Sequence, residues 1–249
     1  MKKEIRFIDE KKGIIRITTT DERVYAIPSI NPVTQLPSYE FYPSVTYITG
    51  FYPKGRFFEA WLKNMGNEAE VVKQLAAEKG SKVHQAIALL LGGATLSIEQ
   101  NLINTTTGKE EEITSDEYKT VLTFVKWFKD VNPKIISFDE TVYNAVIGYA
   151  GSLDLSCEID GVPYIVDFKT SKDIFPGHEL QISAYKHTPG NEDKKLAILQ
   201  IGYTRNKNGY KFTDIDDKFD LFLATHQIFL HEVGSVTPRE IELPSKIKL

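Results

Sequence analysis

The chain has 249 residues, of which 41% are hydrophobic, and a formal net charge of −4. That length and apolar content suit one large globular domain, or a compact domain with an appendage. The net negative charge excludes a broad basic coat for nucleic acid, so any such contact must be local. The single cysteine, Cys157, excludes a disulfide framework and a four-cysteine metal site supplied by this chain alone.

Membrane and export signals are not seen in the sequence. No segment approaches the roughly 20 consecutive apolar residues of a membrane span, and the first residues lack the apolar core of a signal peptide. Together with the single cysteine, this predicts an intracellular protein of a reducing compartment such as the cytoplasm, with no membrane partner. An organelle remains an alternative location.

The N-terminal segment, residues 1–43, has two parts. Its first 27 residues alternate apolar and polar side chains, which predicts a small β-meander with turns at Lys12-Gly13 and at Thr20-Asp21-Glu22. Residues 28–43 contain four prolines that oppose regular structure and predict a loop or a lid. These prolines are Pro28, Pro32, Pro37 and Pro43.

Residues 44–131 are predicted to form a helical arch. Ser44 begins a short helix that ends at Gly50. Apolar residues at helical spacing then predict three longer helices. Gly80 is expected to interrupt the second of these, and residues 98–108 form a polar excursion before the third. The three helices span residues 56–65, 67–91 and 115–131.

Residues 132–235 are predicted to form the catalytic core of a main domain that spans residues 44–249. Here the pattern changes to apolar, β-prone runs separated by turn signals. The predicted strands span residues 135–146, 150–159, 162–169, 195–203 and 210–215, and the predicted helices span residues 177–187 and 219–233. The expected fold class is mixed α/β (α+β), with a central mixed sheet flanked by helices and a small N-terminal β-meander.

The motif Asp167-Phe168-Lys169 carries the chemistry. Asp-x-Lys occurs four times in the chain, but only this copy follows both an apolar run and a turn signal at Asp160-Gly161. A hairpin at that turn would place Asp154 of the preceding strand beside Asp167. Two carboxylates and an amine at a sheet edge can bind a divalent metal and activate water. The alternative is a surface salt bridge on a two-stranded ribbon.

Residues 54–82 mix six basic with four acidic side chains and several aromatic ones. Such a mixture can hold phosphates and stack bases. The alternative is a mixed-charge helical surface over an aromatic core. The candidate DNA-binding residues in this region are Lys54, Arg56, Trp61, Lys63 and Lys82.

A series of short motifs occurs in order between about residue 43 and residue 205. They are Pro43-Ser-Val-Thr46, the helix with Trp61, Gly80-Ser-Lys-Val-His84, Glu140, Gly151-Ser-Leu-Asp154, Val166-Asp-Phe-Lys169-Thr-Ser and Gln181-Ile-Ser-Ala-Tyr185. In this order and spacing they resemble the RecB-like branch of the PD-(D/E)XK nuclease superfamily, which includes phage-encoded exonucleases and the mitochondrial genome maintenance exonuclease.

The resemblance implies a restriction-endonuclease-like core and a Mg²⁺ or Mn²⁺ site. Its ligands would be Asp154, Asp167, the Phe168 carbonyl and His84, with Glu140 as a further acid that binds a second metal or holds a basic neighbour. Oxygen ligands suit Mg²⁺, whereas the histidine nitrogen favours Mn²⁺. Between two acids Lys169 is expected to stay charged and to position water or offset developing charge, rather than to act as a base.

Further residues are expected around this centre. Gln181 and Tyr185 lie one helical turn apart and share a face, from which they are expected to support Lys169; the alternative is an ordinary polar helix face. Thr170 and Ser171 follow the motif and are expected to contact DNA. The remaining histidines are expected to have no part in the site: His178, His187, His226 and His231.

The chain also departs from this family. It lacks the four cysteines that hold an iron–sulfur cluster in several relatives, a fused helicase, and a phosphate-binding loop for ATP. A helicase or recombinase partner would therefore be a separate polypeptide. The expected function is a metal-dependent exonuclease that acts on single-stranded DNA or DNA ends in replication, recombination or repair. A structure-specific endonuclease and a catalytically silent DNA-binding recombination subunit are the alternatives.

Overall fold

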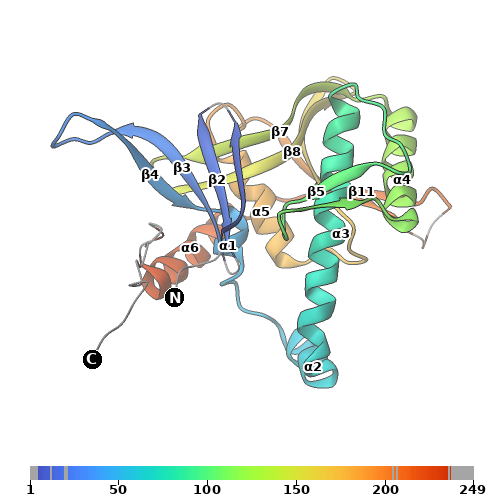
Figure 1. Cartoon of the computed structure of the whole chain (residues 1–249), viewed down its shortest axis with the longest axis horizontal. Coiled ribbons are helices and arrows are strands. Elements are labelled where there is room, and N and C mark those ends of the chain that lie inside the picture. The colour runs from blue at the N-terminus through green and yellow to red at the C-terminus, as the bar shows by residue number, and fades with distance from the viewer. Residues whose placement is uncertain are drawn as a thin grey trace, which may run out of the picture.

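The structure, a computed structural model, describes residues 5–236 except Lys12, Thr20, Asp21, Thr204, Asn206 and Ser235 (Figure 1). Within these residues the chain forms three β-sheets and is also rich in helices, which confirms the predicted mixed α and β class. None of the described helices combines the length and the apolar character that a membrane crossing requires.

The predicted N-terminal meander is present as an antiparallel sheet. Its strands are β1 (Ile5–Lys11), β2 (Ile14–Thr19), β3 (Arg23–Ile30) and β4 (Pro37–Pro43), and they lie in this order in the sheet. The residues of the two predicted turns lie partly outside the described chain, at Lys12 and at Thr20 and Asp21.

The prediction of a loop or lid over residues 28–43 is wrong, because most of this segment is the hairpin of β3 and β4. Pro28 pairs with Tyr39 at a point beyond Ala26, the last residue of β3 that pairs with β2, so it has a neighbouring strand on one side only. Pro37 and Pro43 stand at the two ends of β4, an edge strand. A strand tolerates proline at such positions because the ladder does not need its missing N–H.

The predicted helices of the arch are confirmed as α1 (Val45–Thr49), α2 (Arg56–Met65), α3 (Glu68–Leu91) and α4 (Ser115–Val131). The Tyr47 N–H donates a hydrogen bond of 3.1 Å to Ser44 Oγ, so Ser44 caps α1 as expected.

Two details of the arch differ from the predictions. Gly80 does not interrupt α3, because the burial of its C-terminal half outweighs the roughly 1 kcal/mol by which glycine weakens a helix interior. The polar excursion contains β5 (Asn101–Asn104), which pairs in a hairpin with β6 (Lys109–Glu112) directly after it; neither strand was predicted, because both sequences are mostly polar.

The central sheet has five strands in the order β11-β10-β9-β8-β7, with β9 and β10 parallel and the other pairs antiparallel. The predicted strands and helices are confirmed to within two residues at each end. Their bounds are β7 (Lys134–Asn144), β8 (Tyr149–Ile159), β9 (Val162–Lys169), α5 (Pro176–Lys186), β10 (Lys195–Ile201), β11 (Tyr210–Ile215) and α6 (Phe219–Val233).

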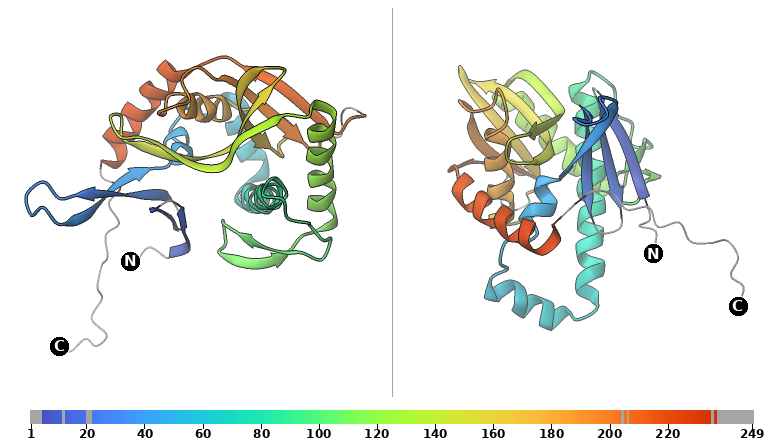
Figure 2. Two further views of the ribbon diagram at one scale, coloured as in Figure 1. Left: turned by 90° about the horizontal axis from the view of Figure 1, so that it is seen from above. Right: turned by 90° about the vertical axis from the view of Figure 1, so that its left-hand side faces the viewer.

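Helices cover both faces of the central sheet (Figure 2). An apolar cluster that includes Trp127 and Phe168 joins one face to α3 and α4. A second cluster, which includes Tyr149 and Phe222, joins the other face to α1, α5 and α6. The N-terminal sheet docks on β8 through Tyr25 and Ile27, which pack against Ala150.

Candidate metal-binding active site

The β8–β9 hairpin places Asp154 and Asp167 side by side. The last ladder pair before them is Leu155 with Val166, so the two aspartates are the next opposed positions on the two strands. Here the strands part, and Asp154 Oδ2 accepts a hydrogen bond of 2.8 Å from the Phe168 N–H. The two acids thus share one end of the hairpin, as predicted.

Asp154 lies at the point in β8 where the apolar side chains switch from one face of the central sheet to the other. Leu153 belongs to the apolar cluster with α1, α5 and α6, whereas Leu155 belongs to the cluster with α3 and α4. Residues two apart on a regular strand share a face, so the strand must rotate between these leucines. The carboxylate of Asp154 therefore belongs to neither apolar cluster, and its side chain keeps 14% exposure.

Helix α3 brings His84 to these strands. Its Nδ1 lies 2.9 Å from Asp154 Oδ1 and its Nε2 lies 3.0 Å from the carbonyl oxygen of Phe168. Both neighbours are acceptors, so the geometry suits a protonated ring that donates from both nitrogens. Burial opposes that charge, but the carboxylate of Asp154 outweighs burial and raises the pKa of His84. In return, His84 outweighs burial at Asp154 and lowers the pKa of that carboxyl.

Asp167 is the most deeply buried acid of the site, at 1% exposure. Its Oδ2 forms an ion pair of 2.6 Å with Lys169 Nζ. Within the described residues, neither of its oxygens receives a hydrogen bond of regular geometry. Burial is the main cause that raises the pKa of Asp167, to about 6; Lys169 opposes the shift and the charge of Asp154 adds to it.

A chain of hydrogen bonds leads from Lys169 into α5. Lys169 Nζ donates to Gln181 Oε1 (3.1 Å), and Gln181 Nε2 donates to Tyr185 Oη (2.9 Å). Gln181 and Tyr185 therefore lie beside Lys169, where the sequence predicted them. Tyr185 packs closely over Gly151 of β8, since a Cβ atom there would lie 2.5 Å from Tyr185 Cε1.

We expect Gly151→Ala to disturb this chain of hydrogen bonds. The added methyl group would displace the buried ring of Tyr185, so the free energy of unfolding should fall by about 1–3 kcal/mol and the hydrogen bond between Gln181 and Tyr185 should weaken. Chemical denaturation measures the stability. Gly55→Ala is the matched control, because Gly55 has nothing within 4 Å of its Cβ position and has an ordinary φ of −71°. Equal stability of the two variants would contradict the close packing of Tyr185 on Gly151.

The segment after β9 is held by Gln200 of β10. Gln200 is buried, and its Nε2 donates to the carbonyl oxygens of Ser171 (3.0 Å) and Lys172 (2.8 Å). The Thr170 side chain lies against α3, with its Oγ1 3.9 Å from the position of a Cβ at Gly80. Thr170 and Ser171 thus directly follow β9 and are held against α3 and β10, and Gln200 is a positioning residue that the sequence analysis missed. Only its apolar surroundings in β10 hinted at a buried role.

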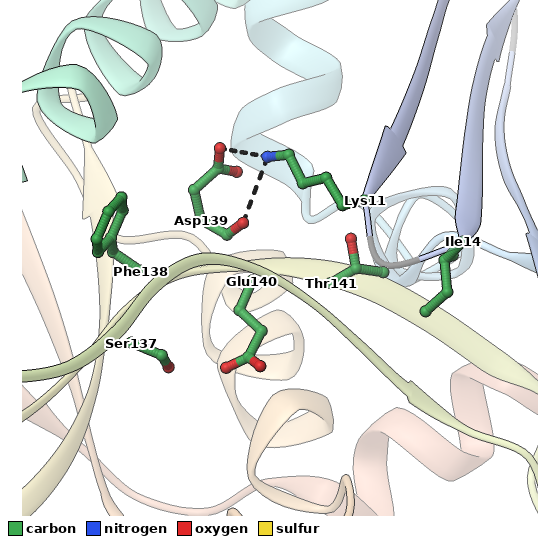
Figure 3. A pocket seen from close by; sticks show the side chains of 7 residues that line it. All are labelled: Lys11, Ile14, Ser137, Phe138, Asp139, Glu140 and Thr141. Carbon is green, nitrogen blue, oxygen red and sulfur yellow. Dashed lines mark hydrogen bonds and ion pairs between the residues drawn. The ribbon is translucent and has the colours of Figure 1, made fainter. Parts of the chain in front are cut away.

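The structure does not bring Glu140 to the other acids. Glu140 lies on β7 beside a cavity of about 120 Å³ between the N-terminal sheet and the core (Figure 3). Its carboxylate and that of Asp139 lie on opposite sides of the β7 ribbon, and its charge acts on Lys194. Asp139 accepts hydrogen bonds from Lys11 at both its carboxylate and its carbonyl oxygen. The metal-binding role predicted for Glu140 therefore has no support in this arrangement.

The cations predicted to hold DNA are spread along the arch. Lys54, Arg56 and Lys63 are exposed, and the partly buried Trp61 stacks near Phe58 with ring centroids 5.6 Å apart. Figure 1 shows α2, which carries Arg56, Trp61 and Lys63, at the end of α3 that points away from the central sheet. These residues form a separate surface from the aspartates.

His178, for which the sequence predicted no part in the site, lies in the first turn of α5 within the electrostatic reach of Lys169 and Lys54. Burial is the first cause that lowers its pKa to about 3, followed by the positive charges of Lys169 and Lys54. The ring is therefore neutral near pH 7, and its Nδ1 accepts a hydrogen bond from the Phe175 N–H (3.3 Å) at the start of α5. The position of His178 in the first turn of a helix after Pro176 was the available signal.

The placement of Lys82 argues against its predicted contact with DNA. Its side chain is buried, and its ammonium lies 3.0 Å from Glu117 and 3.5 Å from Glu111. Glu117 also accepts a hydrogen bond from the Thr114 N–H at the start of α4. Lys82 therefore joins α3 to α4 and β6 instead of facing a ligand.

The donor set fits a divalent cation. Asp154 and the Phe168 carbonyl both lie against His84, while the buried carboxylate of Asp167 on the neighbouring strand has the ammonium of Lys169 as its charged partner. Among the described residues, no group of three or more His, Cys, Asp or Glu side chains already surrounds one metal position. In this structure His84 is bound to Asp154 and Lys169 to Asp167, so a cation would have to displace these contacts.

The chain was compared with models of protein families and with curated proteins. No protein-family model matches the chain, and no curated protein matches it either.

Proposed function

We propose that this protein is a Mg²⁺- or Mn²⁺-dependent deoxyribonuclease of the PD-(D/E)XK superfamily, similar to its RecB-like exonucleases. The observation that carries the proposal is the buried carboxylate of Asp167, which lacks a hydrogen-bond donor among the described residues and lies opposite Asp154 with Lys169 as its ion-pair partner. Lys169 compensates part of this charge, but burial still raises the pKa of Asp167 to about 6. A cation-binding role explains why a carboxylate is kept at so buried a position.

The mixed five-stranded sheet also supports the proposal. A restriction-endonuclease-like core needs acids on a hairpin at one end of a mixed sheet and helices on both faces, and the chain has both features. The alternative of a surface salt bridge on a two-stranded ribbon is disfavoured, because Asp167 is at 1% exposure inside a five-stranded sheet.

The residues of the site have distinct tasks in this proposal. A divalent cation held by Asp154, Asp167, the Phe168 carbonyl and His84 would supply a water of lowered pKa and neutralise phosphate charge. Asp167 must lose its proton to take part, which its pKa of about 6 allows at neutral pH. The ammonium of Lys169 stabilises the negative charge that develops on the phosphate, and Gln181 holds that ammonium in place.

The substrate of the proposal is single-stranded DNA or a DNA end. The exposed cations Lys54, Arg56 and Lys63 offer contacts to phosphates, and Trp61 offers a surface for stacking bases. The protein would act in replication, recombination or repair in the cytoplasm of a bacterial or phage-infected cell, with any helicase or recombinase as a separate partner.

End-labelled linear DNA and covalently closed circular DNA test this function. With Mg²⁺ or Mn²⁺ we expect linear single strands to be shortened from an end, closed circles to persist, and EDTA to stop the reaction. Rapid cutting of closed circles would instead identify an endonuclease with the same site. Binding without cleavage in either metal would identify a catalytically silent DNA-binding subunit.

A further inference from the structure

One face of the N-terminal sheet presents arginines to the core. Arg16 lies directly opposite Tyr25 in the β2–β3 ladder, and Arg23 lies two residues before Tyr25, so the three side chains share a face. Tyr25 is at 1% exposure, packs on Ala150 and lies 3.0 Å from Ser152 Oγ through its hydroxyl group. This face is therefore the one that meets β8.

Arg23 has no anionic partner within the described chain. Its Nε atom is buried and receives no hydrogen-bond acceptor, and none of the described carboxylates forms an ion pair with it. The other two cations of this face are paired, Arg16 with Asp9 at 3.2 Å and Lys11 with Asp139. In the described part of the chain Arg23 therefore has a hydrogen bond with Tyr25 but no carboxylate partner.

The surroundings of Arg23 favour an anion. Burial lowers the pKa of Arg23, and the like charge of Arg16 lowers it further, while the hydroxyl groups of Tyr25 and Tyr185 oppose the shift. Two guanidinium groups near each other repel unless a negative group joins them. A phosphate matches the planar guanidinium in shape and charge.

Arg23 also lies beside the proposed catalytic chain of hydrogen bonds. Its neighbour Tyr185 accepts a hydrogen bond from Gln181, which accepts one from Lys169. Figure 2 (left) shows the N-terminal sheet in blue and α3 in teal on the same side of β7. The N-terminal sheet, which carries Arg23, therefore lies on the same side of β7 as the helix whose His84 contacts Asp154.

We propose that Arg23 binds a backbone phosphate of the substrate strand next to the phosphate that is cleaved, so that the N-terminal sheet is one wall of the DNA-binding site. This inference rests on the proposed function. The inference assigns a role to the N-terminal sheet, which lies outside the series of motifs found in the sequence.

Arg23→Gln tests the inference, with Lys134→Gln as the matched control. Lys134 is 77% exposed at the far end of β7, so its replacement changes the net charge equally without touching the site. Binding of a fluorescent single-stranded oligonucleotide is measured in Ca²⁺ over a series of salt concentrations. We expect Arg23→Gln to weaken binding about 10-fold and to reduce the slope of log K against log salt by about 0.7, the value for one phosphate contact on a single strand. The control should change neither quantity.

Two further measurements distinguish a structural role of Arg23 from binding of a phosphate. Arg23→Lys keeps the charge and should keep the salt slope. A scan with oligonucleotides that carry one neutral methylphosphonate should find a position that weakens binding by the wild-type protein but not by Arg23→Gln. Additive losses at every position would overturn the inference.

The two proposals fail in different ways. Wild-type protein that cleaves DNA, with Arg23→Gln binding as tightly as wild type and with the same salt slope, would overturn the role of Arg23 alone. Wild-type protein that neither binds nor cleaves DNA would overturn the proposed function and this inference with it.

Discussion

Asp167→Asn is expected to abolish cleavage and, at the same time, to make the metal-free protein more stable above pH 6. Asparagine keeps the shape of the side chain but removes the charge that would hold the cation, so cleavage should fall by about 1,000-fold or more. The gain in stability follows from the burial of this carboxylate at 1% exposure.

The pH dependence of this gain has a definite sign. In the folded protein the pKa of Asp167 is about 6, raised from its ordinary value of 3.8. The stability contributed by its protonated form is therefore complete below about pH 4 and is lost as the pH rises through 6. At pH 8 the ionised group should cost on the order of 2–3 kcal/mol, and Asp167→Asn should recover most of this.

Chemical denaturation in EDTA at pH 5 and pH 8 measures the difference between the variant and the wild-type protein. It should be larger at pH 8. Asp160→Asn is the control, since Asn-Gly forms the same tight turn as Asp-Gly. A variant that is less stable than the wild-type protein at pH 8 would show that the ion pair with Lys169 already satisfies Asp167 without a metal ion.

Lys169→Met is expected to remove most cleavage while sparing the binding of DNA. The ammonium lies 2.6 Å from Asp167 and 3.1 Å from Gln181. In the proposed function it therefore acts on the phosphate that is cleaved and not on the rest of the DNA strand. Loss of one such charge from a buried site should lower kcat about 100- to 1,000-fold. Because Lys169 holds the pKa of Asp167 down, the acid limb of the remaining activity should also move to higher pH.

The measurements are single-turnover cleavage over a range of pH and oligonucleotide affinity in Ca²⁺. Lys172→Met is the control, because the side chain of Lys172 is exposed and only its backbone carbonyl is held by Gln200. Equal losses of affinity and of rate would contradict a role confined to the chemical step, and an unchanged pH profile would contradict the electrostatic link to Asp167.

The pairing of Asp154 with Asp167 was predictable because a tight turn determines register. Asp160 and Gly161 have φ values of 50° and 79°, so they form the two-residue turn that the sequence indicated. Counting outward from this turn places residue 154 opposite residue 167. Local chemistry was sufficient here, and it was also sufficient for the caps and the apolar faces of most helices.

Segments whose structure depends on distant partners were not predictable in this way. Prolines opposed a strand at residues 28–43, but β2 ends before Pro28, and the ladder therefore does not need its N–H. The residues of β5 and β6 are mostly polar and are held by pairing with each other. The local propensity of a segment does not show where its neighbouring strand ends or which segment pairs with it.

Long-range charge pairing limited the prediction of the site. Lys82 resembled a DNA contact by its place in a basic stretch, yet it is buried against Glu117, 35 residues further along the chain, at 3.0 Å. A role for Arg23 was not predictable from the sequence, because Arg23 lies on a separate sheet more than a hundred residues before Tyr185. Such contacts follow from the packing of elements rather than from any local pattern.

Titration of the metal-free protein with Mn²⁺, followed by the loss of the electron paramagnetic resonance signal of the free ion, tests the central claim most directly. The wild-type protein should bind Mn²⁺ at pH 8 in a site that is absent from both Asp154→Asn and Asp167→Asn and is retained in Asp160→Asn. Binding of equal affinity and stoichiometry in all four proteins would contradict the assignment of the two aspartates as ligands.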